Sequence, residues 1–128
     1  MASLVQLEAG TDSDRPMIAG VIENRIQKKM PLQIDATILY ALQKWQRLTF
    51  KDYHSVKSPY NTYLVKGLPP GPICSPDEID IEAAMHPAKH NFLFYVALPD
   101  GSSIYAATYK EHLKNIRIRK AALKALKK

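Results

Sequence analysis

Several features that direct a sequence toward particular protein classes are scarce or missing in this chain. With a single cysteine, Cys74, it cannot form an internal disulfide, so it is not a small disulfide-stabilised scaffold. No apolar run approaches the ~18 residues that a membrane span needs, and the first residues do not combine a basic region with an apolar stretch. We therefore expect neither a membrane anchor nor an export signal within this chain.

Motifs for metals and cofactors are equally scarce. The stretch GLPPG at residues 67–71 has too few free N–H groups to cradle a phosphate. His86 and His90 have the i, i+4 spacing of metal ligands on a helix, but Pro87 between them breaks the helix. Cys74 lies in no motif that would make it a nucleophile. We therefore predict no metal site and no cofactor.

The composition is that of an ordinary globular domain, with 46% apolar and 23% charged residues in a chain of 128. The net charge of +6 is unevenly distributed. Residues 110–128 hold eight Lys and Arg against one acid, about +7, which leaves residues 1–109 near −1. A nearly neutral body argues against nucleic-acid binding. The tail is typical of a basic surface helix, and attraction to an anionic polymer or membrane surface is the alternative.

Local signals predict helices over residues 1–9, 13–29, 34–45, 75–86 and 110–128. Asp35 is expected to cap the third of these helices. In the fourth, Ser75 is expected as the N-cap, with Glu78 three residues later completing a capping box. Residues 46–57 show no such pattern, and we expect them to be irregular.

A β-hairpin is predicted between residues 91–97 and 103–109, two apolar stretches that flank the turn sequence PDGS. Helices followed by a hairpin and a basic helix indicate the α+β class. We therefore predict one compact domain over residues 1–128, built from several helices, a β-hairpin and a C-terminal basic helix.

The first residues contain the most informative pattern. Met1, Leu4, Val5 and Glu8 fall at i, i+3, i+4 and i+7, which is one face of a helix. Three of them are apolar and the fourth is a carboxylic acid. If this face is buried, desolvation raises the pKa of Glu8 toward neutrality, as a general acid requires. The alternative, which the pattern leaves open, is that Glu8 reaches solvent at the end of the helix.

A stiff loop occupies residues 58–76, which hold five of the nine prolines and two of the five glycines. Proline restricts the backbone, so this loop is a shaped surface of the kind that often carries binding residues. Tyr60 and Tyr63 flank Asn61 and Thr62 within it. Such tyrosines either pack half-buried with a solvated hydroxyl, or combine with the polar pair to bind a sugar ring. The sequence leaves both interpretations open.

Six stretches of this chain are ASLVQLEAG, DRPMIAGVIENRI, LQIDATILYAL, SPYNTYLVKGLPPGPI, AAMHPAK and FYVALPDG followed by TYKEH. In these motifs and their order, which cover nearly the whole chain, the sequence resembles the YceG-like family of endolytic murein transglycosylases. The resemblance implies cleavage of the β-1,4 bond between N-acetylmuramic acid (MurNAc) and N-acetylglucosamine (GlcNAc) within peptidoglycan strands. The C6 hydroxyl of MurNAc attacks its own C1, which leaves a 1,6-anhydro end.

The resemblance also implies site residues. The family's catalytic acid is the second Glu of its opening motif, which corresponds to Glu8, while the first Glu of that motif is replaced by Gln6. The family tends to carry a His in the hairpin where this chain has Ser103. The residues implied for substrate binding are Gln33, Asp35, Tyr60, Asn61, Thr62 and Tyr63.

By resemblance, the partners are peptidoglycan glycan strands and peptidoglycan synthases, with no cofactor and no membrane contact required of this chain itself. Members of the family carry an upstream membrane helix and a LysM-like region, which are not found in residues 1–128. The resemblance therefore implies a parent protein anchored in the inner membrane, with this catalytic domain outside the cytoplasm. Two other functions stay open: a peptidoglycan-binding module without activity, and a glycoside hydrolase that pairs Glu8 with Asp35.

Overall fold

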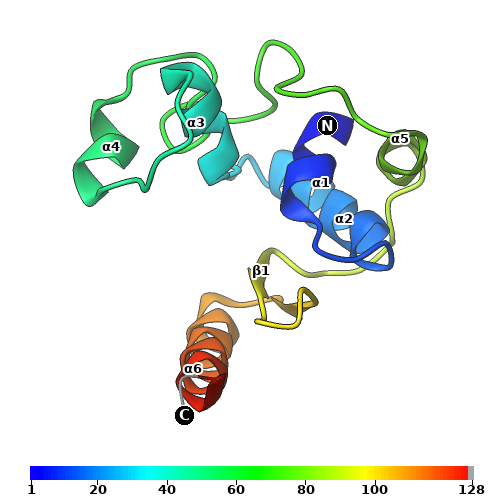
Figure 1. Cartoon of the computed structure of the whole chain (residues 1–128). Coiled ribbons are helices and arrows are strands. Elements are labelled where there is room, and N and C mark those ends of the chain that lie inside the picture. The colour runs from blue at the N-terminus through cyan, green and yellow to red at the C-terminus, as the bar shows by residue number, and fades with distance from the viewer. Residues whose placement is uncertain (127–128) are drawn as a thin grey trace.

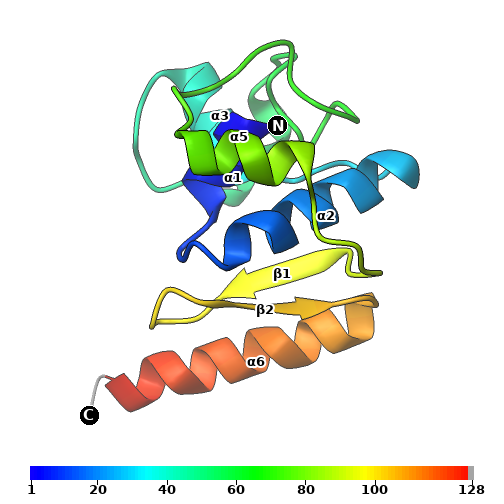
Figure 2. The same cartoon turned by 90° about the vertical axis from the view of Figure 1, so that its right-hand side faces the viewer.

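In the computed structural model, which describes residues 1–126, helices precede and follow a single β-hairpin (Figure 1). The helices are α1 (Ala2–Glu8), α2 (Asp14–Gln27), α3 (Asp35–Leu42), α4 (Phe50–Ser55), α5 (Glu78–Met85) and α6 (Tyr109–Leu126), and the strands are β1 (Phe94–Ala97) and β2 (Ser103–Ala106). Figure 2 shows α5, α2, the hairpin and α6 stacked in successive layers, with α1 behind α5. The predicted single α+β domain is confirmed.

The hydrophobic core lies where α1 and α2 pack against each other and against the start of α3. Its buried side chains include Leu4, Val5, Ile18, Ile22 and Ile34. Burying each such aliphatic side chain contributes roughly 1.5–3 kcal/mol. Leu4 and Val5 are 1% and 0% exposed, which confirms the predicted apolar face of the first helix. Because Glu8 ends that helix on the same face, it lies at the edge of the core.

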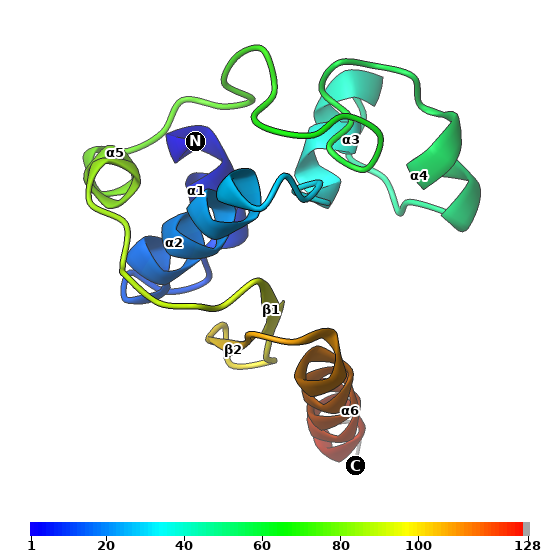
Figure 3. The ribbon, with the colours of Figure 1, turned by 180° about the vertical axis from the view of Figure 1, so that it is seen from behind.

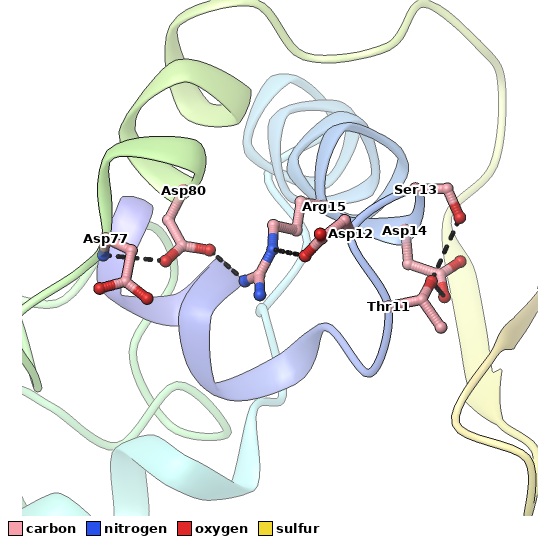
Figure 4. Close-up of polar contacts among 7 residues, drawn as sticks. All are labelled: Thr11, Asp12, Ser13, Asp14, Arg15, Asp77 and Asp80. Carbon is pink, nitrogen blue, oxygen red and sulfur yellow. Dashed lines mark hydrogen bonds and ion pairs between the residues drawn. The ribbon is translucent and has the colours of Figure 1, made fainter.

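An ion pair inside the protein joins α2 to α5 (Figure 4). Arg15, in the first turn of α2, donates to the carboxylate of Asp80, which is completely buried in α5. The same carboxylate accepts a hydrogen bond from the backbone N–H of Asp77 at 3.0 Å, which caps α5. Arg15 also reaches Asp12 at 3.2 Å. Because a buried carboxylate is stable only when paired, this network fixes α5 against α2.

The hairpin is antiparallel, with Phe94 paired to Ala106 and Ala97 paired to Ser103. Its turn uses the predicted PDG sequence, and Gly101 adopts a positive φ of 94°. The turn lies close to the end of α1, since a Cβ added to Gly10 would come within 1.9 Å of the Gly101 carbonyl oxygen. Helix α6 packs on both strands. This packing brings the end of α1, the hairpin and α6 together.

The structure corrects three local predictions. Residues 46–57 are not wholly irregular, because α4 forms there, begun by a capping box between Thr49 and Asp52. Helix α5 is capped by Asp77 and Asp80 in place of Ser75 and Glu78, since the buried carboxylate of Asp80 is available to the cap.

The third correction concerns α3. Ile34 occupies the cap position, and Asp35 is the first helical residue, where its side chain bonds to tyrosines of neighbouring segments. The helix ends at Leu42, before the predicted residue 45, because Gln43 turns into the left-handed region with φ 56°. Asp35 is therefore free to take part in tertiary contacts.

Helix α6 confirms the predicted basic C-terminal helix, and residues 127–128 of that prediction lie outside the described residues. Within residues 1–126, no helix has both the length and the apolar character that crossing a bilayer requires. Figure 3 shows the proline-rich loop running from the α3 and α4 side of the molecule to α5. The loop therefore borders α3.

Candidate active site

A pocket of about 380 Å³ opens beside the end of α1, in the size range of ligand-binding sites. Its walls come from α1, α2, the start of α3, the proline-rich loop, β1 and α6, segments that are far apart in the sequence. Its polar lining consists of Glu8, Arg25, Gln33, Asp35, Tyr63, Tyr95, Tyr109, His112 and Arg119. The pocket thus gathers four of the seven residues that the sequence implicated: Glu8, Gln33, Asp35 and Tyr63.

Glu8 is largely withdrawn from solvent inside this pocket. Burial raises the pKa of Glu8 above its ordinary value, and the negative charge of Asp35 raises it further, while a hydrogen bond from Tyr95 opposes the rise. In that bond the Tyr95 hydroxyl donates to Oε2 at 3.0 Å. A carboxyl group with a raised pKa keeps its proton closer to neutral pH, so Glu8 has the property of a general acid.

Asp35 is held by two tyrosine hydroxyls. Tyr63 donates to Oδ1 at 2.6 Å, and Tyr53, from α4, donates to Oδ2 at 3.3 Å. The two rings lie together, with centroids 4.6 Å apart. Burial and the hydrogen bond to Asp35 raise the pKa of Tyr63 well above its ordinary value, so its hydroxyl stays a donor. Asp35 is thus a carboxylate held in place by hydrogen bonds, and its negative charge contributes to the raised pKa of Glu8.

Asn61 and Thr62 do not line the pocket, and with exposed fractions of 0% and 1% they present no surface to a ligand. Asn61 donates to two main-chain carbonyls at the α4 end of the loop, at 2.8 and 3.3 Å, and accepts from the Tyr63 N–H at 2.9 Å. The Thr62 hydroxyl accepts from the Ile34 N–H at 2.9 Å. These contacts fix the loop against the start of α3.

Tyr60 also lies outside the pocket lining. Its ring packs on Tyr40 with centroids 4.8 Å apart and contacts the hydrophobic core. In contrast, Gln33 is exposed at the pocket, with a backbone φ of 54° and an N–H that donates to the Thr62 carbonyl at 3.2 Å. The two tyrosines of the loop therefore differ in environment: Tyr60 packs, while Tyr63 faces the pocket.

Comparison with known proteins agrees with the motifs of the sequence. The pattern of the YceG-like family matches residues 1–118. The chain belongs to the YceG-like family. An endolytic murein transglycosylase of Bacillus subtilis strain 168 is 47% identical over 115 residues, which are 89% of this chain and 32% of that protein. One from Streptococcus pneumoniae strain D39 is 38% identical over 122 residues, 91% of this chain and 22% of that protein.

A crystal structure of a YceG-like protein from Listeria monocytogenes has the same fold. It superposes with a TM-score of 0.84 at 43% sequence identity, covering 89% of this chain and 38% of the other. The chain therefore spans about a third or less of the length of the curated relatives it matches.

Sequence reasoning missed the five other polar residues of this YceG-like pocket: Arg25, Tyr95, Tyr109, His112 and Arg119. Arg25 had a recognisable signal, because it follows Ile18 and Ile22 at i+7 and i+3 on the buried face of α2. Like Glu8, Arg25 is a charged residue on the apolar face of a helix. The other four had no such signal, since the packing of the hairpin and α6 brings them to the pocket.

Proposed function

We propose that this chain is the catalytic domain of an endolytic lytic transglycosylase. Its substrate is the MurNAc-β-1,4-GlcNAc bond of peptidoglycan strands, and its product ends in 1,6-anhydroMurNAc. The observation that carries the proposal is Glu8, a carboxyl group with a raised pKa inside a pocket. The similarity to proteins named endolytic murein transglycosylases supports the reaction class.

In the proposed reaction Glu8 acts twice. As the acid it gives its proton to the glycosidic oxygen while the bond from that oxygen to MurNAc C1 breaks. As the carboxylate it then takes the proton of the MurNAc C6 hydroxyl, whose oxygen forms the new bond to C1. No water is consumed, and Glu8 is protonated again at the end. Because the nucleophile belongs to the substrate, proximity removes the need for a second catalytic carboxylate.

The neighbours of Glu8 suit this double role. Tyr95 binds Oε2, and within residues 1–126 no protein group bonds to Oε1, so that oxygen is available to the substrate. Asp35 adds a fixed negative charge, which favours the protonated acid and stabilises positive charge developing at C1. Asn61 and Thr62 would act by positioning Tyr63 and the loop, rather than by touching sugar.

The same pocket geometry is compatible with one alternative reaction, hydrolysis of the glycosidic bond. Asp35 and Glu8 line one pocket, as a hydrolase that activates water would require. The products distinguish the two reactions, because a hydrolase leaves reducing ends that are one water heavier than anhydro ends. Purified peptidoglycan is digested with the protein and the ends are identified by mass spectrometry. Anhydro ends support the transglycosylase, reducing ends support the hydrolase, and binding without cleavage supports a binding module.

Location and partners follow from the substrate. Since peptidoglycan lies outside the cytoplasm, we infer that this domain acts there. An anchored parent protein and an association with peptidoglycan synthases are proposals that rest on the family resemblance. Co-purification of the full-length protein with synthases from detergent-solubilised membranes tests the association.

A further inference from the structure

Arg25 is a buried cation in the pocket wall that has no acidic partner. Its side chain is 8% exposed, and it donates from Nε to the Leu93 carbonyl at 2.6 Å and from Nη1 to the Pro31 carbonyl at 2.7 Å. Within residues 1–126 no carboxylate forms an ion pair with it, and no protein atom accepts a hydrogen bond from Nη2. Nη2 is not enclosed by protein, so its two N–H groups are open to a ligand in the pocket that Arg25 lines.

His112, from α6, is a second unsatisfied group in the same wall. Its ring stacks on Phe94 with centroids 4.9 Å apart, and the guanidinium carbon of Arg25 lies 5.0 Å from the centre of the same ring. Nδ1 of His112 is buried and has no hydrogen-bond partner in the described part of the chain. Burial and the charge of Arg25 lower the pKa of His112, so the imidazole is neutral near pH 7. Both side chains line the pocket that holds Glu8.

Nη2 of Arg25 opens to the pocket, and a flip of the His112 ring would bring its unpaired Nδ1 to the same side, so a ligand there would satisfy both groups. A guanidinium presents coplanar N–H donors, which match the sp² oxygens of carboxylate and amide groups better than a hydroxyl. A neutral imidazole adds one donor or acceptor, according to its tautomer. The saccharide of the proposed function carries such oxygens in its acetamido groups, and MurNAc carries another in its 3-O-lactyl group.

We propose that Arg25 and His112 form a subsite that binds an acyl oxygen of the saccharide. The proposal rests on the proposed function, and it names these two residues as determinants of substrate recognition. Two sources provide the acyl oxygen: the acetamido group, common to both sugars, and the lactyl group, which only MurNAc carries. In a peptide-free strand the lactyl group is a carboxylate, which a guanidinium binds more strongly than an amide.

The test measures saccharide binding by titration calorimetry to the full chain carrying Glu8→Gln, which prevents cleavage. His112→Phe keeps the stacking on Phe94 but removes both ring nitrogens, and Arg25→Lys keeps the charge but removes the planar fork. His86→Phe, at an exposed histidine outside the pocket, is the matched control. The ligands are a peptide-free MurNAc–GlcNAc oligosaccharide and a chitooligosaccharide of equal length. Thermal unfolding verifies that each variant is folded.

Loss of a hydrogen bond to a charged group corresponds to roughly 10- to 100-fold weaker binding. We expect that loss for the MurNAc–GlcNAc ligand with Arg25→Lys, roughly 2- to 10-fold weaker binding with His112→Phe, because a bond from a neutral ring is weaker, and no change with His86→Phe. An equal loss for chitooligosaccharide assigns the acetamido oxygen, and a smaller one assigns the lactyl group. In ¹⁵N NMR spectra of the Glu8→Gln protein, the His112 ring signals should also shift on adding the MurNAc–GlcNAc ligand.

Unchanged affinity for both saccharides in both folded variants would overturn the subsite and leave the proposed function intact. An unmoved His112 ring signal at saturating saccharide would do the same. If the Glu8→Gln protein itself binds neither saccharide, the subsite and the proposed function are both contradicted.

Discussion

Replacing Asn61 with alanine tests whether this residue shapes the site or touches the substrate. Its side chain is fully buried and makes three hydrogen bonds, at 2.8, 2.9 and 3.3 Å. Each such bond contributes about 0.5–1.5 kcal/mol, and water can replace part of what is lost at the edge of the loop. We therefore expect Asn61→Ala to lower the free energy of unfolding by about 2–3 kcal/mol. Urea denaturation followed by circular dichroism measures it.

Saccharide binding should weaken in the same variant, because the Tyr63 N–H loses its acceptor and the hydroxyl that holds Asp35 is less well placed. Lys66→Ala, at an exposed position of the same loop, is the control and should change stability by less than about 0.5 kcal/mol. The reasoning is refuted if Asn61→Ala leaves unfolding unchanged and yet abolishes binding. That result would mean that Asn61 contacts the saccharide directly.

Two further predictions concern pH and the buried ion pair. Activity should fall as pH rises through the pKa of Glu8, since the acid must be protonated. Tyr95→Phe removes the hydrogen bond that lowers this pKa and should move the alkaline limb of kcat/KM to higher pH. Asp35→Asn removes the negative charge that raises this pKa and should move the limb to lower pH. Shifts in the same direction would contradict this assignment. Asp80→Asn leaves Arg15 without its buried partner and should lower the free energy of unfolding by about 3 kcal/mol, measured in urea; a loss below about 1 kcal/mol would show that the pair is dispensable.

The parts of the fold that follow from local chemistry were predictable. The spacing of apolar residues within the first eight positions predicts both a helix and its buried face. It therefore placed Leu4 and Val5 in the core and Glu8 at its edge. The hairpin followed from the PDG turn, where Gly101 accepts a positive φ. Helix α4 was missed because it is only six residues long and has no buried residue. Its capping box was therefore the only local signal.

The site was predictable only in part, because a pocket is a tertiary feature. Tyr60 and Tyr63 are equivalent in sequence, yet one packs on Tyr40 and the other bonds to Asp35, according to how the loop is pinned by buried side chains. His112 lies on a helix whose pattern predicts only a basic surface. Its place beside the pocket depends on the packing of α6 against the hairpin.

The most direct test of this account compares the Glu8→Gln variant with the wild-type chain on purified peptidoglycan. Since burial disfavours the charged carboxylate, an uncharged glutamine should not lower the stability of the fold above neutral pH, so that lost activity reports on chemistry. Glu82→Gln, at an exposed position of α5, is the matched control. We predict that Glu8→Gln releases 1,6-anhydroMurNAc ends ~10²–10⁴-fold more slowly, while Glu82→Gln matches wild type. Equal rates for Glu8→Gln and wild type would contradict the assignment of Glu8 as the catalytic acid.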